Sequence, residues 1–161
     1  MSSPPWYAGS SITAAGLDQL IPFISVLSGD QTIDTTADIV VGGMATQTLP
    51  AGTYVASACL SYICGASAGT PTFGVHAAPV SQQAYVSNIF VSGNQFPQVS
   101  ADSAGVTGPT MVDDEILLLW YEYTFTTTEA GTCSFQAHTS NAGDPFTINA
   151  GARFRVDSVL S

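Results

Sequence analysis

The acidic side chains best placed to do chemistry stand directly before a strongly apolar run. Asp113, Asp114 and Glu115 precede the run ILLLWY at residues 116–121, and carboxylates are ligands that Ca²⁺ prefers. The three acids do not alternate with other residues as the ligands of a calcium loop do. The sequence therefore favours a solvated start of a strand, whose charges oppose aggregation of the run that follows. Calcium binding is kept as the alternative.

A further carboxylate, Glu122, lies inside the apolar stretch that follows, on the same face as Leu118 and Trp120. A buried carboxylate with a raised pKa can act as a general acid. More often such a group pairs with an arginine, and the chain has two cationic side chains, Arg153 and Arg155. We therefore predict a structural ion pair between Glu122 and one of these arginines.

Histidine and cysteine side chains are the other candidates for chemistry. His76 and His138 could ligate zinc together with Cys59, Cys64 or Cys133, but no two of these residues have C-x-x-C or H-x-x-x-H spacing. The odd separation of Cys59 and Cys64 puts them on opposite faces of a regular strand, which argues against a bridge between them. We expect three free thiols, as in a reducing compartment, and no metal site.

Motifs of catalysis and phosphate binding are missing from the sequence. It contains no G-x-S-x-G elbow and no lysine with which to build a phosphate-binding loop. We therefore expect that the chain is not an enzyme, has no catalytic residues and needs no cofactor.

Charge limits the partners of the chain. The net charge is −10 and only 9% of the residues are charged, whereas about 25% is usual. Binding to nucleic acids or to anionic membranes requires cations, so neither is expected as a partner. The N-terminus lacks the basic and apolar regions of a signal peptide and no apolar run could span a bilayer, so we expect synthesis in a cytoplasm.

The elements that carry these residues fall into two parts. Residues 1–21 form an N-terminal arm, in which Ile12 and Leu17 have the spacing of a hydrophobic staple around a short helical turn. Leu20 continues the same face, and Pro22 ends the helix. The arm is apolar but too short to fold alone.

Residues 22–161 follow a period of two. In the run EILLLWYEYTFTT, the side chains at 117, 119, 121, 123 and 125 share one face, as in a half-buried strand. About eight to ten such runs with turns between them predict one all-β domain, an antiparallel jelly-roll-like sandwich or barrel.

Three stretches resemble known proteins, two of them one group of phage proteins and the third a known type of jelly roll. The leader WYAGSSITAAGLDQLIP resembles the opening of small structural proteins encoded by tailed phages of actinobacteria, and AGTCSFQAHTSNAGDPFTINAGARFRVDSVL resembles their C-terminal strands. The segment LPAGTYVASACLSY resembles the strand opening of C1q/TNF-like jelly rolls. In NAGARFRV the chain has Ala152 where that group usually carries Ser or Thr after the glycine.

The resemblance implies a virion structural protein made in the host cytoplasm. It implies a homotrimer that docks on the major capsid protein or another virion protein, most simply as a capsid decoration protein. A tail-fibre or tail-tip module that binds host-surface carbohydrate is the alternative, and a secreted C1q/TNF-like ligand is disfavoured by the missing signal peptide. The arm would then be the attachment segment, since Trp and Tyr are common anchors of interfaces. Its apolar anchors are Trp6, Tyr7, Ile12, Leu17 and Leu20.

Overall fold

Strands make up all the regular structure that the computed structural model describes. It describes the backbone of residues 22–65, 70–78, 82–91, 94–100, 106–107 and 116–159, and the side chains of 22–65, 70–78 and 116–159. No helix occurs in these ranges, and no helix there could cross a membrane. The predicted helical turn of the arm falls outside the described residues.

Twelve strands follow one another along the described chain. They are β1 (Phe23–Val26), β2 (Gln31–Ile33), β3 (Ile39–Ala45), β4 (Gly52–Cys64), β5 (Pro71–Ala78), β6 (Gln82–Val91), β7 (Asn94–Ser100), β8 (Val106–Thr107), β9 (Ile116–Thr127), β10 (Thr132–Thr139), β11 (Phe146–Ile148) and β12 (Arg153–Val159).

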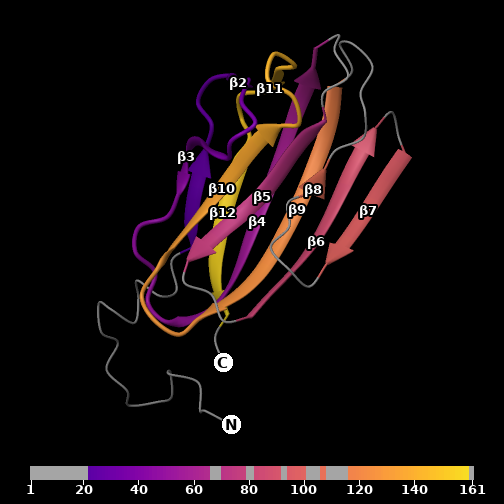
Figure 1. Cartoon of the computed structure of the whole chain (residues 1–161). Helices are drawn as coiled ribbons and strands as arrows, with labels where there is room; N and C mark the ends of the chain where they lie inside the picture. The colour runs from indigo at the N-terminus through magenta and orange to yellow at the C-terminus, as the bar shows by residue number, and fades with distance from the viewer. Residues whose placement is uncertain are drawn as a thin grey trace, which may run out of the picture.

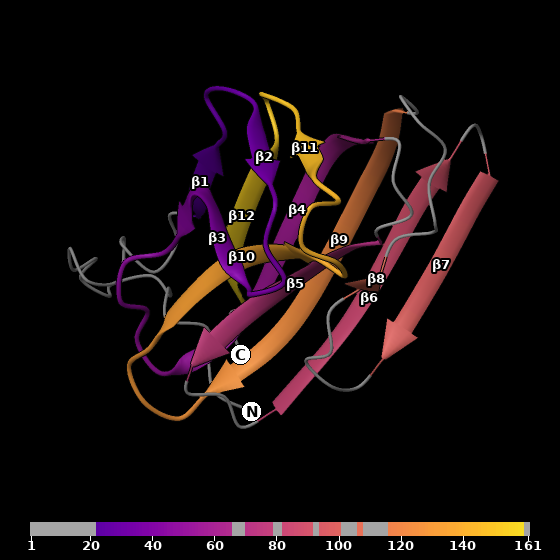
Figure 2. The same ribbon diagram turned by 45° about the horizontal axis from the view of Figure 1, so that its top comes forward.

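The strands form two antiparallel sheets packed face to face. The large sheet has the order β1-β12-β4-β9-β6-β7, with β11 beside β4 and β2 beside β11. The small sheet has the order β3-β10-β5-β8 and lies across one face of the large sheet (Figures 1 and 2). This confirms the predicted all-β antiparallel sandwich.

The chain crosses repeatedly between the two sheets. It passes from β3 to β4, from β4 to β5, from β8 to β9 and from β9 to β10, changing sheet each time. Repeated crossing between two antiparallel sheets is typical of jelly-roll-like sandwiches, although here the large sheet has eight strands and the small sheet four. The hairpin β6–β7 is added beyond β9, on the side away from β1 and β3 (Figure 2).

Aromatic side chains fill the space between the sheets. Phe73 of the small sheet stacks on Phe135 at 6.2 Å between ring centroids and contacts Tyr62 and Phe146 of the large sheet at 4.9 and 5.4 Å. All four are at most 2% exposed. On β9, the predicted inward set is buried to the same degree: Leu117, Leu119, Tyr121, Tyr123 and Phe125.

Candidate interaction face

The outer face of the large sheet, turned away from the small sheet, brings together Glu122, both arginines and Cys59. Strand pairing aligns them across four strands, β1, β12, β4 and β9. One row reads Val26, Arg153, Cys59, Trp120, and the next row reads Ile24, Arg155, Ser57, Glu122.

Large apolar side chains on β9 form the first feature of this face, named here the β9 strip. Ile116, Leu118 and Trp120 are 60, 54 and 46% exposed, although their neighbours on the inner face of the same strand are buried. The run is apolar on both faces, yet the small sheet covers only one of them. Contiguous exposed apolar side chains of this kind mark interaction sites.

A second apolar feature lies at the opposite edge of the same face. Ile24 and Val26 of β1 are 44 and 55% exposed and are named here the β1 strip. These two residues were not predicted from the sequence. The available signal was the run IPFISVL, in which apolar residues occupy both alternating sets and so cannot all face one core.

The chain's two arginines lie between the two strips, on β12. Arg155 donates from Nε and Nη2 to the two carboxylate oxygens of Asp157 at 2.7 and 2.6 Å. This hydrogen-bonded pair raises the pKa of Arg155. Arg153 has no ion pair with any described residue.

The predicted ion pair of Glu122 with either arginine does not form among the described residues. Arg155 pairs with Asp157 instead, and β4 separates β9 from β12. In the row of Arg155, Ser57 stands between that arginine and Glu122. Alternation along β9 gave the correct face for Glu122, but the lateral order of the strands keeps the acid and the cations apart.

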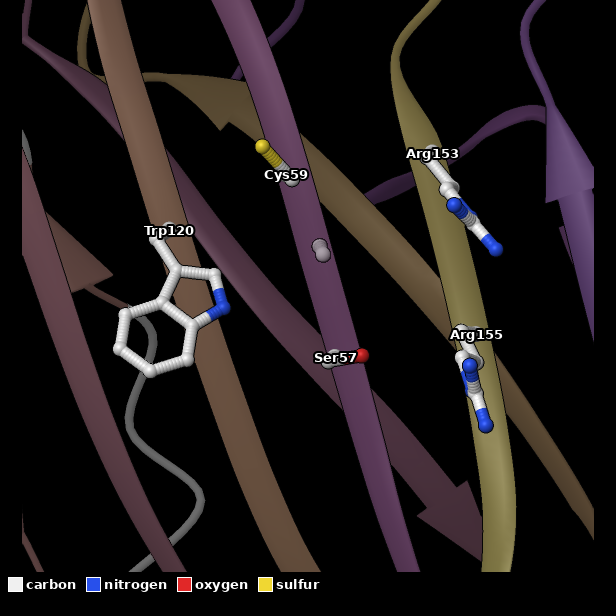
Figure 3. Close-up of a pocket in the computed structure, with 6 residues that line it drawn as sticks. Ser57, Cys59, Trp120, Arg153 and Arg155 are labelled. Atoms are coloured by element: carbon white, nitrogen blue, oxygen red, sulfur yellow. The ribbon is translucent and has the colours of Figure 1, made fainter.

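A shallow groove of about 220 Å³ opens on this face. In Figure 3 the indole of Trp120 stands on one side of β4, and the side chains of Arg153 and Arg155 lie at β12, on the other side of β4. The groove therefore combines an aromatic plane, a thiol and hydrogen-bond donors. Its lining consists of Ser57, Ala58, Cys59, Trp120, Arg153 and Arg155.

The turn that leads into β12 fixes the two arginines on this face. Asp30 accepts a hydrogen bond from the backbone N–H of Ala150 at 2.7 Å, and Gly151 adopts a φ of 88° that favours glycine. Leu27 exchanges backbone hydrogen bonds with Gly151 and Ala152 at 2.9 and 2.8 Å. These contacts set the register in which Arg153 faces outward.

The predicted thiols and histidines do not form a metal site in the described part of the chain. Cys59 is exposed, whereas Cys64 and Cys133 are buried, and all three are free. Burial raises the pKa of Cys64 to about 11 and of Cys133 to about 12. His138 lies 2.6 Å from the carboxylate of Asp38. Within the described ranges, no group of three or more His, Cys, Asp or Glu could hold a metal ion.

The remaining predicted residues fall outside the described residues. This holds for the acids that precede β9, Asp113, Asp114 and Glu115, and for the anchors of the arm: Trp6, Tyr7, Ile12, Leu17 and Leu20.

Comparisons with known proteins do not assign a function to the chain. No protein-family model matches the chain, and no curated protein matches it. Among solved structures it is similar to that of the Gx strain of infectious bursal disease virus, with 14% identity over 96% of this chain and 48% of that one and a TM-score of 0.21. The VP2 subviral particle of the same virus gives 12% identity over 88% of this chain and 42% of that one, with a TM-score of 0.22. The chain spans less than half of these chains, and likeness at this level carries no functional argument.

Proposed function

We propose that the chain is a structural protein of a tailed-phage virion, a homotrimer that decorates the capsid and reinforces it. The observation that carries the proposal is the β9 strip, a row of three large apolar side chains left uncovered by the chain's own small sheet. Full burial of one such side chain contributes roughly 1.5–3 kcal/mol. Covering the strip with a second copy therefore supplies a substantial part of an assembly energy.

The surface chemistry supports a protein that works inside an assembly. Only 9% of its residues are charged, so a separate monomer would keep a surface unusually poor in charge in water. The large sheet ends on one side in the short strand β1, whose outer edge pairs with no other described strand, and such an edge invites further contacts. A closed cyclic oligomer covers such surfaces because every subunit meets the next in the same way.

Attachment to the particle is assigned to the N-terminal arm. The arm precedes β1, which begins at Phe23 on the edge of the large sheet. Its five apolar anchors and its resemblance to the leaders of phage structural proteins support docking on the major capsid protein or another virion protein. The proposal assigns the chain to the virion, with no catalysis and no cofactor.

Deletion of residues 2–21 tests the attachment. The truncated protein should fold with the circular dichroism of the full chain but should no longer co-sediment with phage particles that lack this protein. A full-length variant with Trp6→Ala and Tyr7→Ala is the matched control, since it weakens the anchors and leaves the length unchanged. Co-sedimentation of the truncated protein at full affinity would contradict the attachment role.

A tail-fibre or tail-tip module that binds host-surface carbohydrate is the second candidate, favoured by one observation. Trp120, 46% exposed, lines an open groove beside Arg153, and sugar sites combine an aromatic plane with a few placed polar groups. Titration of host-envelope polysaccharide into the protein distinguishes the two candidates. Saturable binding that Trp120→Ala removes would favour the tail module over the decoration protein.

A further inference from the structure

We infer that copies of this chain meet head to tail, with the β9 strip of one copy on the β1 strip of the next and Glu122 of the first paired with Arg153 of the second. The inference rests on the proposed self-assembly and names the surfaces that carry it. It uses the two apolar strips and two charged residues, Glu122 and Arg153, for which no ion pair is found within the described ranges.

The distribution of charge points to the outer face of the large sheet as the surface where two copies meet. The net charge is −10 and the chain has two arginines and no lysine, so most surfaces of two copies repel each other. Both arginines lie on β12 and face outward from the large sheet. Histidines and the N-terminus apart, an attractive ionic contact between copies must therefore use this face.

Of the two arginines, Arg153 is the one available to a neighbour. Arg155 is already held by both carboxylate oxygens of Asp157. Arg153 has no such partner among the described residues and is the cross-strand neighbour of Val26 in the β1 strip. An incoming apolar side chain that covers Val26 therefore arrives beside a guanidinium group.

The complementary carboxylate stands beside the β9 strip. Glu122 is half-buried, follows Trp120 by two residues on the same face of β9, and forms no ion pair in the described chain. The spacing of Glu122 from Trp120 along the strand is about 6.6 Å, and that of Arg153 from Val26 across strands is about 5 Å. When Trp120 covers Val26, Glu122 therefore comes within reach of Arg153.

The two strips occupy different places on one face, at β1 and at β9. A contact that joins one strip of each copy and leaves the other strip free for a third copy is heterologous, and it forms a ring, as a trimer requires, when the rotation between copies closes. In a two-fold dimer each strip of one copy would instead meet the other strip of its partner, and no strip would remain free.

The available area suits a weak contact that depends on protein concentration. The path of the large sheet from β1 to β7 has six strands, a width of about 24 Å at the usual spacing. β9, with 12 residues, is about 40 Å long, whereas β1 has 4 residues. The whole face therefore offers on the order of 900 Å² at most, and a contact that uses half of it buries about 450 Å² per partner, below the roughly 800 Å² of stable interfaces.

A charge exchange tests the pairing by sedimentation equilibrium of the full chain. Glu122→Arg and Arg153→Glu should each weaken self-association about tenfold or more, because like charges then face each other. The double variant should have an association constant within about threefold of that of the original protein. Glu129→Arg, which makes the same charge change in the exposed turn after β9, should not weaken it.

Outcomes of this experiment separate the inference from the proposed function. A double variant no better than either single variant would overturn the pairing, as would a monomeric original protein. Co-sedimentation with particles reports on the virion role independently of either result.

Mixing two variants tests whether the β9 strip meets the β1 strip rather than its own kind. Val26→Asp spoils the β1 strip and Leu118→Asp spoils the β9 strip, so each variant alone should be monomeric. A mixture retains one intact contact, between the β9 strip of the first and the β1 strip of the second, and should yield one-to-one pairs. Monomers in the mixture would indicate that like patches meet, and would overturn the heterologous contact.

Discussion

The outer faces of the two sheets differ sharply, although both belong to one sandwich. In the described part of the chain, six of the seven exposed large hydrophobic side chains lie on the large sheet and one lies on the small sheet. Both arginines also face outward from the large sheet. The six are Ile24, Val26, Ile116, Leu118, Trp120 and Val159, and the seventh is Val40.

The small sheet presents the kind of outer face that needs no partner. His76 and Gln136 project from β5 and β10, and His138 of β10 contacts Asp38 at 2.6 Å. Antiparallel sheets commonly have one face on the core and one in water, and the small sheet follows that rule. The large sheet departs from it, which indicates that its outer face serves an interaction.

The largest expected effect comes from placing a charge on each outer face in turn. Leu118→Asp on the large sheet should abolish self-association, since a carboxylate buried without a partner is strongly unfavourable. Val40→Asp on the small sheet makes the same kind of change at a similarly exposed position. It should leave the size of the assembly unaltered. Sedimentation velocity over a range of concentrations measures both. Equal effects of the two variants would remove the distinction between the faces.

A second comparison sets the two faces of β9 against each other. Leu119 is 1% exposed and Leu118 is 54% exposed. Leu119→Ala should lower the free energy of unfolding by about 2–5 kcal/mol. Leu118→Ala should change it by less than about 1 kcal/mol. Urea denaturation at concentrations where copies are separated measures both, and a large loss for Leu118→Ala would mean that its side chain belongs to the core.

Alkaline pH should distinguish the core thiols from the thiol of the outer face. The pKa is raised from 9.0 to about 11 for Cys64 and to about 12 for Cys133, so above pH 9 the unfolded chain binds fewer protons than the folded chain. Stability is therefore complete below about pH 9 and falls as the pH rises toward 12, by about 1.4 kcal/mol per unit of pKa difference.

Denaturation midpoints between pH 8 and 11 provide the measurement. Cys133→Ala should flatten the decline, because one of the two buried thiols no longer contributes. Cys59→Ser, on the exposed face, should leave the slope as it is. A decline of equal steepness in all three proteins would exclude the buried thiols as its cause.

Alternation along single strands was sufficient to predict the sandwich and much of its core. The inward set of β9 and the face shared by Glu122, Leu118 and Trp120 both follow from a period of two, and the structure bears them out. Strong local patterns of this kind depend on neighbours along the chain, which the sequence displays directly.

The lateral arrangement could not be predicted in the same way. The sequence does not reveal that β4 lies between β9 and β12, so the expected pairing of Glu122 with an arginine overlooked the intervening strand. The local competitor was also overlooked: Asp157 lies two residues from Arg155 and therefore on the same face of β12. The exposed apolar residues of β1 were not identified either, because the sequence does not show that β1 is an edge strand of the large sheet whose outer side the small sheet leaves uncovered.

Labelling of Cys59 tests most directly whether copies meet on the outer face of the large sheet. Cys59 is the cross-strand neighbour of both Trp120 and Arg153 and is exposed, whereas the other two cysteines are buried. Under native conditions a maleimide should therefore modify Cys59 alone. The rate at which the maleimide modifies Cys59 should fall as protein concentration rises, in step with the increase in the mass of the assembly. In the Leu118→Asp variant this rate should stay fast at every concentration. A Cys59 rate that stays constant while the mass increases would contradict the account, because the copies would then meet elsewhere.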